Sequence, residues 1–126
     1  QIIEALKVCQ NKLKFHTNFF LVLADQEQLQ YRLYLEAKGV VDLSQLELDL
    51  DSQLRGINVE YASKRESERL AAMKVVLVQD GTYGAYKKFS VNQGQREGQF
   101  KVMTLQYAGD CVFPIDEWTQ HEDQDS

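Results

Sequence analysis

The sequence predicts a small α+β domain, a two-layer sandwich in which helices pack on a mixed sheet of three or four strands. Three observations indicate this class. The opening residues place apolar side chains at helical spacing, the next two segments alternate with a period of two, and residues 73–78 are almost continuously apolar. The expected element order is α-β-β-α-α-β-α. The 126 residues fit one domain, which we assign to 1–115, followed by an acidic, disordered tail at 116–126.

The first three elements follow from two different periods. Four apolar residues fall at helical spacing at the start of the chain: Ile2, Leu6, Cys9 and Leu13. They predict an amphipathic helix with one face to bury. Residues 15–23 and 29–37 then alternate in polarity and are joined by the polar link 25–28. This arrangement predicts an antiparallel hairpin with one covered face.

Two helices should follow the hairpin. Asp42 and Ser44 each precede a Gln or Glu by three residues, so either can form the capping box of the second helix. The apolar stripe of that helix consists of Leu43, Leu46, Leu50 and Leu54. Gly56 lies where a C-terminal cap belongs. Asn58 can cap a third, highly charged helix over 59–69, with Tyr61 as a packing contact.

The last elements alternate between sheet and helix. The apolar run 73–78 predicts a strand covered on both faces. A turn at 80–81 precedes a final helix that begins at Thr82. Its inward side chains should be aromatic: Tyr83, Tyr86 and Phe89. Residues 105–107 are expected to add a closing edge strand.

Composition excludes several classes of function. The net charge of −5 argues against binding nucleic acid or an anionic membrane, since both need a cationic surface. No segment is apolar for long enough to span a bilayer. Cys9 and Cys111 have no CxxC spacing, so zinc is not expected. A disulfide stays open, but two free thiols in a reducing cytoplasm are the commoner case.

The remaining chemistry centres on one loop, residues 94–101. Two glycines let the backbone turn freely, and Phe100 can anchor the loop while Lys101 projects a compact cation suited to phosphate or carboxylate. A lone loop lysine is more often simply solvated. Other arrangements are weaker: the paired carboxylates of the helices are ordinary on solvent faces, and His16 and His121 have no partners for a hydrolase triad.

Four segments, in this order, resemble the C-terminal domain of the auxin-responsive promoter family, the Gretchen Hagen acyl-acid amido synthetases and their bacterial relatives. Residues 30–36, QYRLYLE, resemble the central strand of that domain. Residues 57–65, INVEYASKR, resemble its helix with Asn, two residues, Tyr and then Arg. Residues 74–83, KVVLVQDGTY, are similar to its strand followed by Gly-Thr-aromatic, and residues 98–101, GQFK, to its Gln-aromatic-Lys loop.

The resemblance implies a mobile C-terminal domain of an adenylate-forming enzyme. In that family ATP and Mg²⁺ activate a carboxylic acid as acyl-adenylate, and an amine or amino acid then displaces AMP. Lys101 would be the catalytic cation, with Gly98, Gln99 and Phe100 as the nucleotide- or substrate-binding loop around it. The chain opens at Gln1 inside a helical pattern without an initiator methionine, so we expect a fragment that lacks the N-terminal adenylation domain. Alone it should bind no cofactor and be inactive.

One departure from the family keeps other functions open. The family follows its lysine with one residue and then Pro-Arg, whereas Lys101 is followed by Val102, Met103 and Thr104. The alternatives are a non-catalytic binding or interaction domain that retains the fold, and an unrelated α+β interaction domain.

Overall fold

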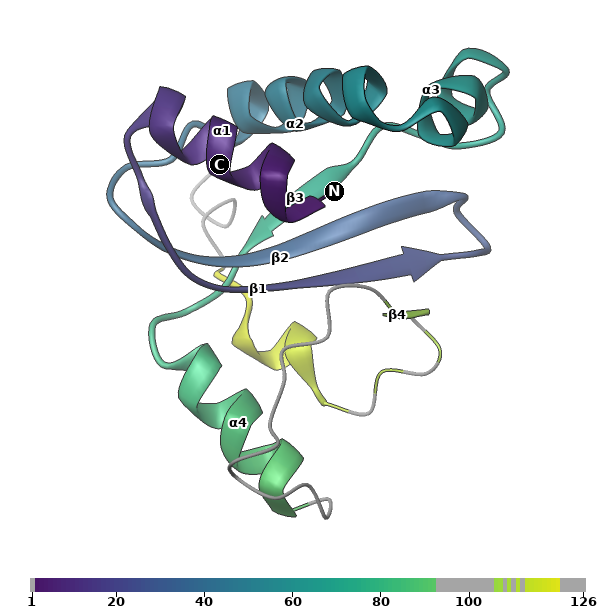
Figure 1. Cartoon of the computed structure of the whole chain (residues 1–126). Helices are drawn as coiled ribbons and strands as arrows, with labels where there is room; N and C mark the ends of the chain where they lie inside the picture. Colours follow the sequence, from purple (N-terminus) through teal and green to yellow (C-terminus); the bar gives the residue numbers. More distant parts are fainter. Residues whose placement is uncertain (1, 93–105, 108, 110, 112, 121–126) are drawn as a thin grey trace, which may run out of the picture.

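The computed structural model of the chain describes residues 2–92, 106–107, 109, 111 and 113–120. Its centre is a mixed four-stranded sheet in the order β3-β2-β1-β4. Helices α1, α2 and α3 lie over one face of the sheet, while α4 and the 3-10 helix η3 lie on the other (Figure 1). The predicted α+β class and the order α-β-β-α-α-β-α are confirmed.

The hairpin forms the middle of the sheet. Strands β1 (His16–Asp25) and β2 (Gln30–Lys38) pair antiparallel, with one irregularity in register between Thr17 and Phe19. In the turn, the Asp25 carboxylate accepts hydrogen bonds of 3.0 Å from the backbone amides of Glu27 and Gln28. Asp in this position stabilises a turn by pairing amides that no strand partner reaches.

The two outer strands are parallel to their neighbours. β3 (Lys74–Leu77) pairs with β2, and the short β4 (Gln106–Tyr107) pairs with β1 at the opposite edge. The expected closing edge strand is therefore present over Gln106–Tyr107, and residue 105 lies outside the described residues. Parallel pairing requires long crossover connections, which α2 and α3 supply between β2 and β3.

Three helices cover the first face: α1 (Ile2–Leu13), α2 (Leu43–Ile57) and α3 (Val59–Glu66). Asp42 is the residue that caps α2, since its side chain accepts the amide hydrogen of Gln45 at 3.1 Å. Asn58 ends α2 and also starts α3, because its amide donates to Leu54 and its side chain accepts from Tyr61. Gly56 therefore lies inside α2 and is not the cap that its position suggested.

The sheet separates two apolar cores. The core under α1–α3 contains Leu33 and Leu35, whereas Tyr34 belongs to the core under α4. Both faces of β2 are therefore buried, and the expectation of one covered face for the hairpin is wrong. The polar residues of the second face suggested exposure to solvent. Tyr34 and Glu36 on this face are instead buried and hydrogen-bonded within the protein.

The second face is completed by α4 (Thr82–Asn92) and η3 (Ile115–Trp118). The backbone beyond η3 pairs with the end of β3. Gln79 donates its amide hydrogen to Trp118 at 2.7 Å, and Gln120 donates to Leu77 at 2.9 Å. Ordered structure therefore continues through residues 116–120, past the boundary expected at 115. Residues 121–126 lie outside the described part of the chain.

Cys9 and Cys111 are free thiols that lie on opposite sides of the sheet. Cys9 is packed in the first core and Cys111 against the second, which excludes a disulfide between them. Burial, with a smaller contribution from Asp49, raises the pKa of Cys9 to about 11. The thiol is therefore protonated at neutral pH and unreactive. No helix among the described residues is long and apolar enough to cross a membrane.

Candidate functional site

The candidate catalytic loop lies in the sequence between helix α4 and the edge strand β4. Gly98, Gln99, Phe100 and Lys101 fall within residues 93–105, outside the described residues. The segment follows α4, which ends at Asn92, and precedes β4 at the sheet edge. The structure therefore describes the elements that flank the loop in the sequence, α4 and β4.

Glu36 connects the central strand to the start of α4. Its carboxylate is buried, with 5% of the residue exposed. One oxygen accepts a hydrogen bond of 2.7 Å from the amide of Tyr83, and the other lies 3.4 Å from the amide nitrogen of Gly81 and 3.5 Å from Nδ2 of Asn18. The backbone amides of Gly81 and Tyr83 lie at the N-terminus of α4, where the helix dipole favours a negative charge. The carboxylate therefore stabilises the N-terminus of this helix from a distant strand.

The segment from Gly81 to Tyr83 supplies the backbone amides that face Glu36. Gly81 has φ of +94°, a conformation that side chains rarely adopt. Thr82 is fully buried, and its hydroxyl donates a 2.6 Å hydrogen bond to the carbonyl of Gln79. The segment that the resemblance singled out thus sets where α4 begins and in which direction it runs toward the candidate loop.

A second polar cluster, here called the Asp51 brace, joins α2 to α3 and consists of Asp51, Arg55, Tyr61 and Arg65. One oxygen of Asp51 accepts the hydroxyl of Tyr61 at 2.5 Å and Nε of Arg65 at 2.7 Å. The other oxygen lies 3.3 Å from Nη2 of Arg65 and 3.2 Å from Nε of Arg55. Arg65 also donates to the carbonyl of Leu70 at 3.1 Å. The brace links α2 to α3 through Tyr61 and Arg65.

The electrostatics of the brace indicate a structural role. Burial alone would raise the pKa of Asp51, but hydrogen bonds from Arg65 and Tyr61 outweigh it and hold that pKa below its usual value. Burial and the hydrogen bond to Asp51 raise the pKa of Tyr61. Asp51 is therefore charged and Tyr61 protonated at neutral pH. An acid held charged and a phenol held neutral are poor candidates for proton transfer.

A third cluster ties the hairpin turn to η3 on the second face. Arg32 pairs with Asp25 at 2.6 Å and donates to the hydroxyl of Tyr34 at 3.1 Å. That hydroxyl donates in turn to Asp116 at 3.0 Å. The backbone amide of Gln28, followed by Arg32, lowers the pKa of Asp25. The cluster explains why residues 116–120 are held against the sheet.

The remaining candidates from the sequence are separated from one another. His16 is exposed at the start of β1, and Asp49 on α2 accepts from Lys12 and Gln45 at 3.3 and 3.0 Å. Within the described ranges, no group of three or more His, Cys, Asp or Glu residues could hold a metal ion. What this part of the chain shows is the hydrogen-bonded packing of the elements that flank residues 93–105 in the sequence.

Sequence reasoning missed the roles of Glu36 and Asp51. Glu36 was placed on the polar side of the second strand, and Asp51 among ordinary surface carboxylates. A signal was present for Asp51, because Tyr61 and Arg65 lie one turn apart on the next helix and together can engage one carboxylate. No comparable local pattern pointed to Glu36.

Comparisons with known proteins identify the fold and the family. Residues 1–108 match the family model of the GH3 family C-terminal domain. A solved GH3.15 acyl acid amido synthetase superimposes with a TM-score of 0.79 at 12% identity, over 94% of this chain and 24% of that chain. AtGH3.15 acyl acid amido synthetase in complex with 2,4-DB gives the same TM-score and identity, with 23% of its chain covered. At this identity the likeness to the two structures shows the fold alone.

The chain spans about a quarter of the length of these synthetases. None of the curated proteins matches it significantly in sequence. The family match includes the four segments that carried the resemblance, and it confirms that resemblance. The chain therefore belongs to the GH3 family and corresponds to its C-terminal domain.

Proposed function

We propose that this chain is the C-terminal domain of an acyl acid amido synthetase and that it carries the catalytic Lys101. The family match over residues 1–108 is the observation that supports this proposal most strongly, because it includes the loop from Gly98 to Lys101. The similar structures are acyl acid amido synthetases about four times as long. The chain would therefore act with an N-terminal adenylation domain, which binds ATP, Mg²⁺ and the carboxylic acid.

The proposed reaction has two half-reactions. A carboxylate oxygen attacks the α-phosphorus of ATP and pyrophosphate leaves, giving an acyl-adenylate. The amine of an amino acid then attacks the acyl carbon, AMP leaves with the electron pair of the C–O bond, and the ammonium proton passes to solvent. Lys101 would donate hydrogen bonds to phosphate or carboxylate oxygens on which negative charge develops. Gln99 and Phe100 would hold the loop so that this ammonium is aimed.

The described part of the chain would supply the rigid support that this role needs. Glu36 holds the first turn of α4, and the helix runs from there to Asn92, directly before the loop. A cation is effective in catalysis only if its position is set before the reaction begins. The remaining assignments are also proposals: small acid and amino acid substrates, a cytoplasmic location, and no nucleic-acid or membrane partner. This chain by itself would bind no cofactor and be inactive.

Acid-dependent ATP–pyrophosphate exchange by the longer protein tests the proposal. The assay would screen a panel of aromatic and aliphatic carboxylic acids, with the 126-residue chain alone as the control. We expect exchange that depends on one class of acid and is absent from the chain alone. Exchange by the chain alone would contradict the proposal that an N-terminal domain binds ATP and the acid.

A second candidate function has one observation in its favour. Met103 and Thr104 stand where the family has Pro-Arg, so the charge next to the loop is lost. A domain that kept the fold for binding or interaction alone would tolerate this change. Absence of exchange and of amide formation with every acid, from a folded parent that still binds ATP, would favour that function.

A further inference from the structure

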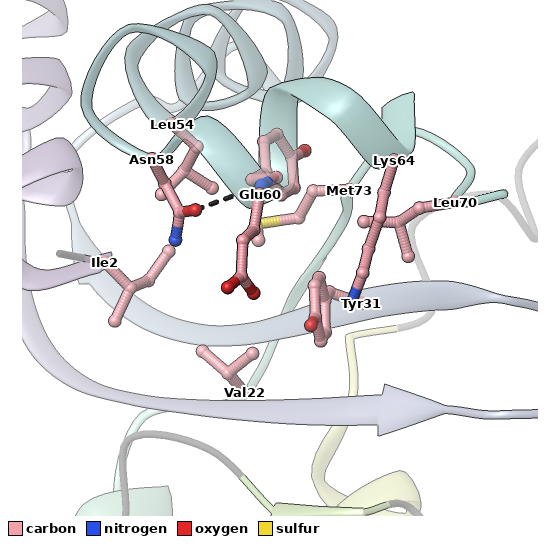
Figure 2. Close-up of a pocket in the computed structure, with 10 residues that line it drawn as sticks. Ile2, Val22, Tyr31, Leu54, Asn58, Glu60, Lys64, Leu70 and Met73 are labelled. Carbon is pink, nitrogen blue, oxygen red and sulfur yellow. Dashed lines mark hydrogen bonds between the residues drawn. The ribbon is translucent and has the colours of Figure 1, made fainter. Parts of the chain in front are cut away.

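A pocket of about 260 Å³ lies between α3 and the sheet, on the face opposite α4 (Figures 1 and 2). It opens where the first turn of α1 approaches the junction of α2 and α3. Its apolar lining is contributed by Ile2, Val22, Leu54, Leu70 and Met73. The volume is just below the range of sites for drug-sized ligands, which suits a small molecule.

The aromatic wall of the pocket is preformed. The rings of Tyr31 and Tyr61 stack with centroids 6.5 Å apart and planes inclined by 20°. Tyr61 is fixed at both ends, because its hydroxyl donates to Asp51 and its backbone amide donates to Asn58 at 3.0 Å. A wall held in this way needs little ordering when a ligand enters.

The mouth of the pocket carries two opposite charges. Glu60 and Lys64 lie one turn apart on α3, so their side chains share one face of the helix. Figure 2 shows both side chains extending from α3 toward the sheet, beside Tyr31 and above Val22. Both residues are exposed, and neither forms an ion pair with the other or with any other described residue. A carboxylate and an ammonium are therefore available at one opening.

We propose that this pocket binds a free amino acid with an apolar side chain. The α-carboxylate would lie at Lys64 and the α-ammonium at Glu60, while the side chain enters the apolar lining. A fatty acid would satisfy only the lysine and a simple amine only the glutamate, so the zwitterion is the small ligand that matches both groups. This inference rests on the pocket and does not depend on the proposed function.

Titration of the ¹⁵N-labelled 126-residue chain with L-leucine tests the proposal by NMR. Two analogues each lack one of the charged groups: 4-methylpentanoate lacks the ammonium, and 3-methylbutylamine lacks the carboxylate. We expect saturable shifts of amide signals along α3 and at Met73 with leucine, and clearly weaker binding of each analogue. Absence of saturable shifts with leucine, or equal binding of the analogues, would overturn the proposal.

Two variants test the charged groups directly. Glu60→Gln and Lys64→Met should each weaken leucine binding about two- to fivefold, as expected for exposed ion pairs. Glu66→Gln is the matched control, since it removes an exposed carboxylate from the same helix without touching the pocket. Wild-type affinity in both pocket variants, with the fold verified by the same spectra, would contradict the assignment. The analogues decide the question independently if a variant fails to fold.

Discussion

At the scale of single residues, two carboxylates with distant partners organise this domain, and one of them is buried and the other half-buried. Glu36 on β2 reaches the amide of Tyr83, which is 47 positions away in the sequence. Asp51 on α2 reaches Tyr61 and Arg65, which are 10 and 14 positions away. Each carboxylate has several donors within hydrogen-bonding distance, and these contacts offset the cost of removing a polar group from water.

Replacement of Glu36 should destabilise the fold. Glu36→Ala removes the acceptor of the first turn of α4, so the free energy of unfolding should fall by about 2–3 kcal/mol. Glu36→Gln keeps an acceptor oxygen and should cost about 1 kcal/mol. Urea denaturation followed by circular dichroism measures both, with Glu27→Ala in the exposed turn as the control. Equal stability of Glu36→Ala and the control would refute the role assigned to this carboxylate.

The lowered pKa of Asp51 predicts a contribution to stability that depends on pH. A carboxyl whose pKa is lower in the folded state stabilises the protein above its unfolded pKa of about 4. That stabilisation is lost as the pH falls through the folded pKa. Between pH 5 and about pH 2, the free energy of unfolding should therefore change less in Asp51→Asn than in the wild type.

Urea denaturation at a series of pH values provides the measurement for Asp51. Glu66→Gln, which removes an exposed carboxylate on α3, is the control. Parallel pH profiles of wild type and Asp51→Asn would show that the carboxylate contributes nothing specific to folding.

The roles of Glu36 and Asp51 could not be predicted from the sequence, whereas the helix caps and the periodic apolar residues could. Asn58 and Asp42 act on amides three positions along the chain, and such local pairs leave a pattern. Glu36 depends on the packing of α4 against the sheet, which no local spacing encodes. Its neighbours Arg32 and Tyr34 have polar groups as well, so the whole second face resembled a solvated one.

At the scale of elements, the short connection at Gly81 determines how α4 starts. Gly81→Ala adds a methyl group in open space, since nothing lies within 4 Å of the new atom. Its cost is therefore the backbone strain at φ of +94°, and the free energy of unfolding should fall by about 1–2 kcal/mol.

Gly84→Ala is the matched control for this prediction. It also adds a methyl group in open space, but within the first turn of α4, where alanine is the better helix former. This variant should be more stable than the wild type by about 0.5–1 kcal/mol. Thermal unfolding of the two variants side by side gives the comparison. Stabilisation by Gly81→Ala would show that the turn does not need its left-handed backbone.

The helices and strands were predicted well where the apolar residues follow one period throughout the segment. The leucine stripe of α2 and the alternation of the hairpin identify a helix and two strands in their observed places. The third helix ends at Glu66, three residues before the prediction, because residues 67–70 form a turn in which Arg69 and Leu70 donate their amides to Lys64. Charged residues continue through this turn, so polarity could not mark the end of the helix.

At the scale of the whole molecule, the two cores depend on different parts of the chain. The second core is closed by Phe113, Ile115 and Trp118 from the C-terminal segment. The rings of Phe113 and Trp118 stack at 6.5 Å, and Asp116 accepts from Tyr34 across the core. Residues that composition assigned to an acidic tail thus belong to the fold through Gln120.

Two truncations test this boundary. A chain that ends at Ile115 should have a free energy of unfolding about 2–4 kcal/mol lower than a chain that ends at Gln120. The difference isolates residues 116–120, which supply the aromatic packing of Trp118 and the backbone pairing with β3. Urea denaturation of both chains is sufficient. Equal stability would restore the boundary at 115.

The central claim for the whole molecule is that Lys101 acts in the formation of an acyl-adenylate. The most direct test compares acid-dependent ATP–pyrophosphate exchange by the longer protein and by its Lys101→Ala variant. Lys7→Ala, which removes an exposed lysine from α1, is the control. We predict that exchange falls about 100-fold or more in Lys101→Ala, in keeping with the loss of one preorganised donor, and is unchanged in Lys7→Ala. Exchange at the wild-type rate in Lys101→Ala would contradict the account.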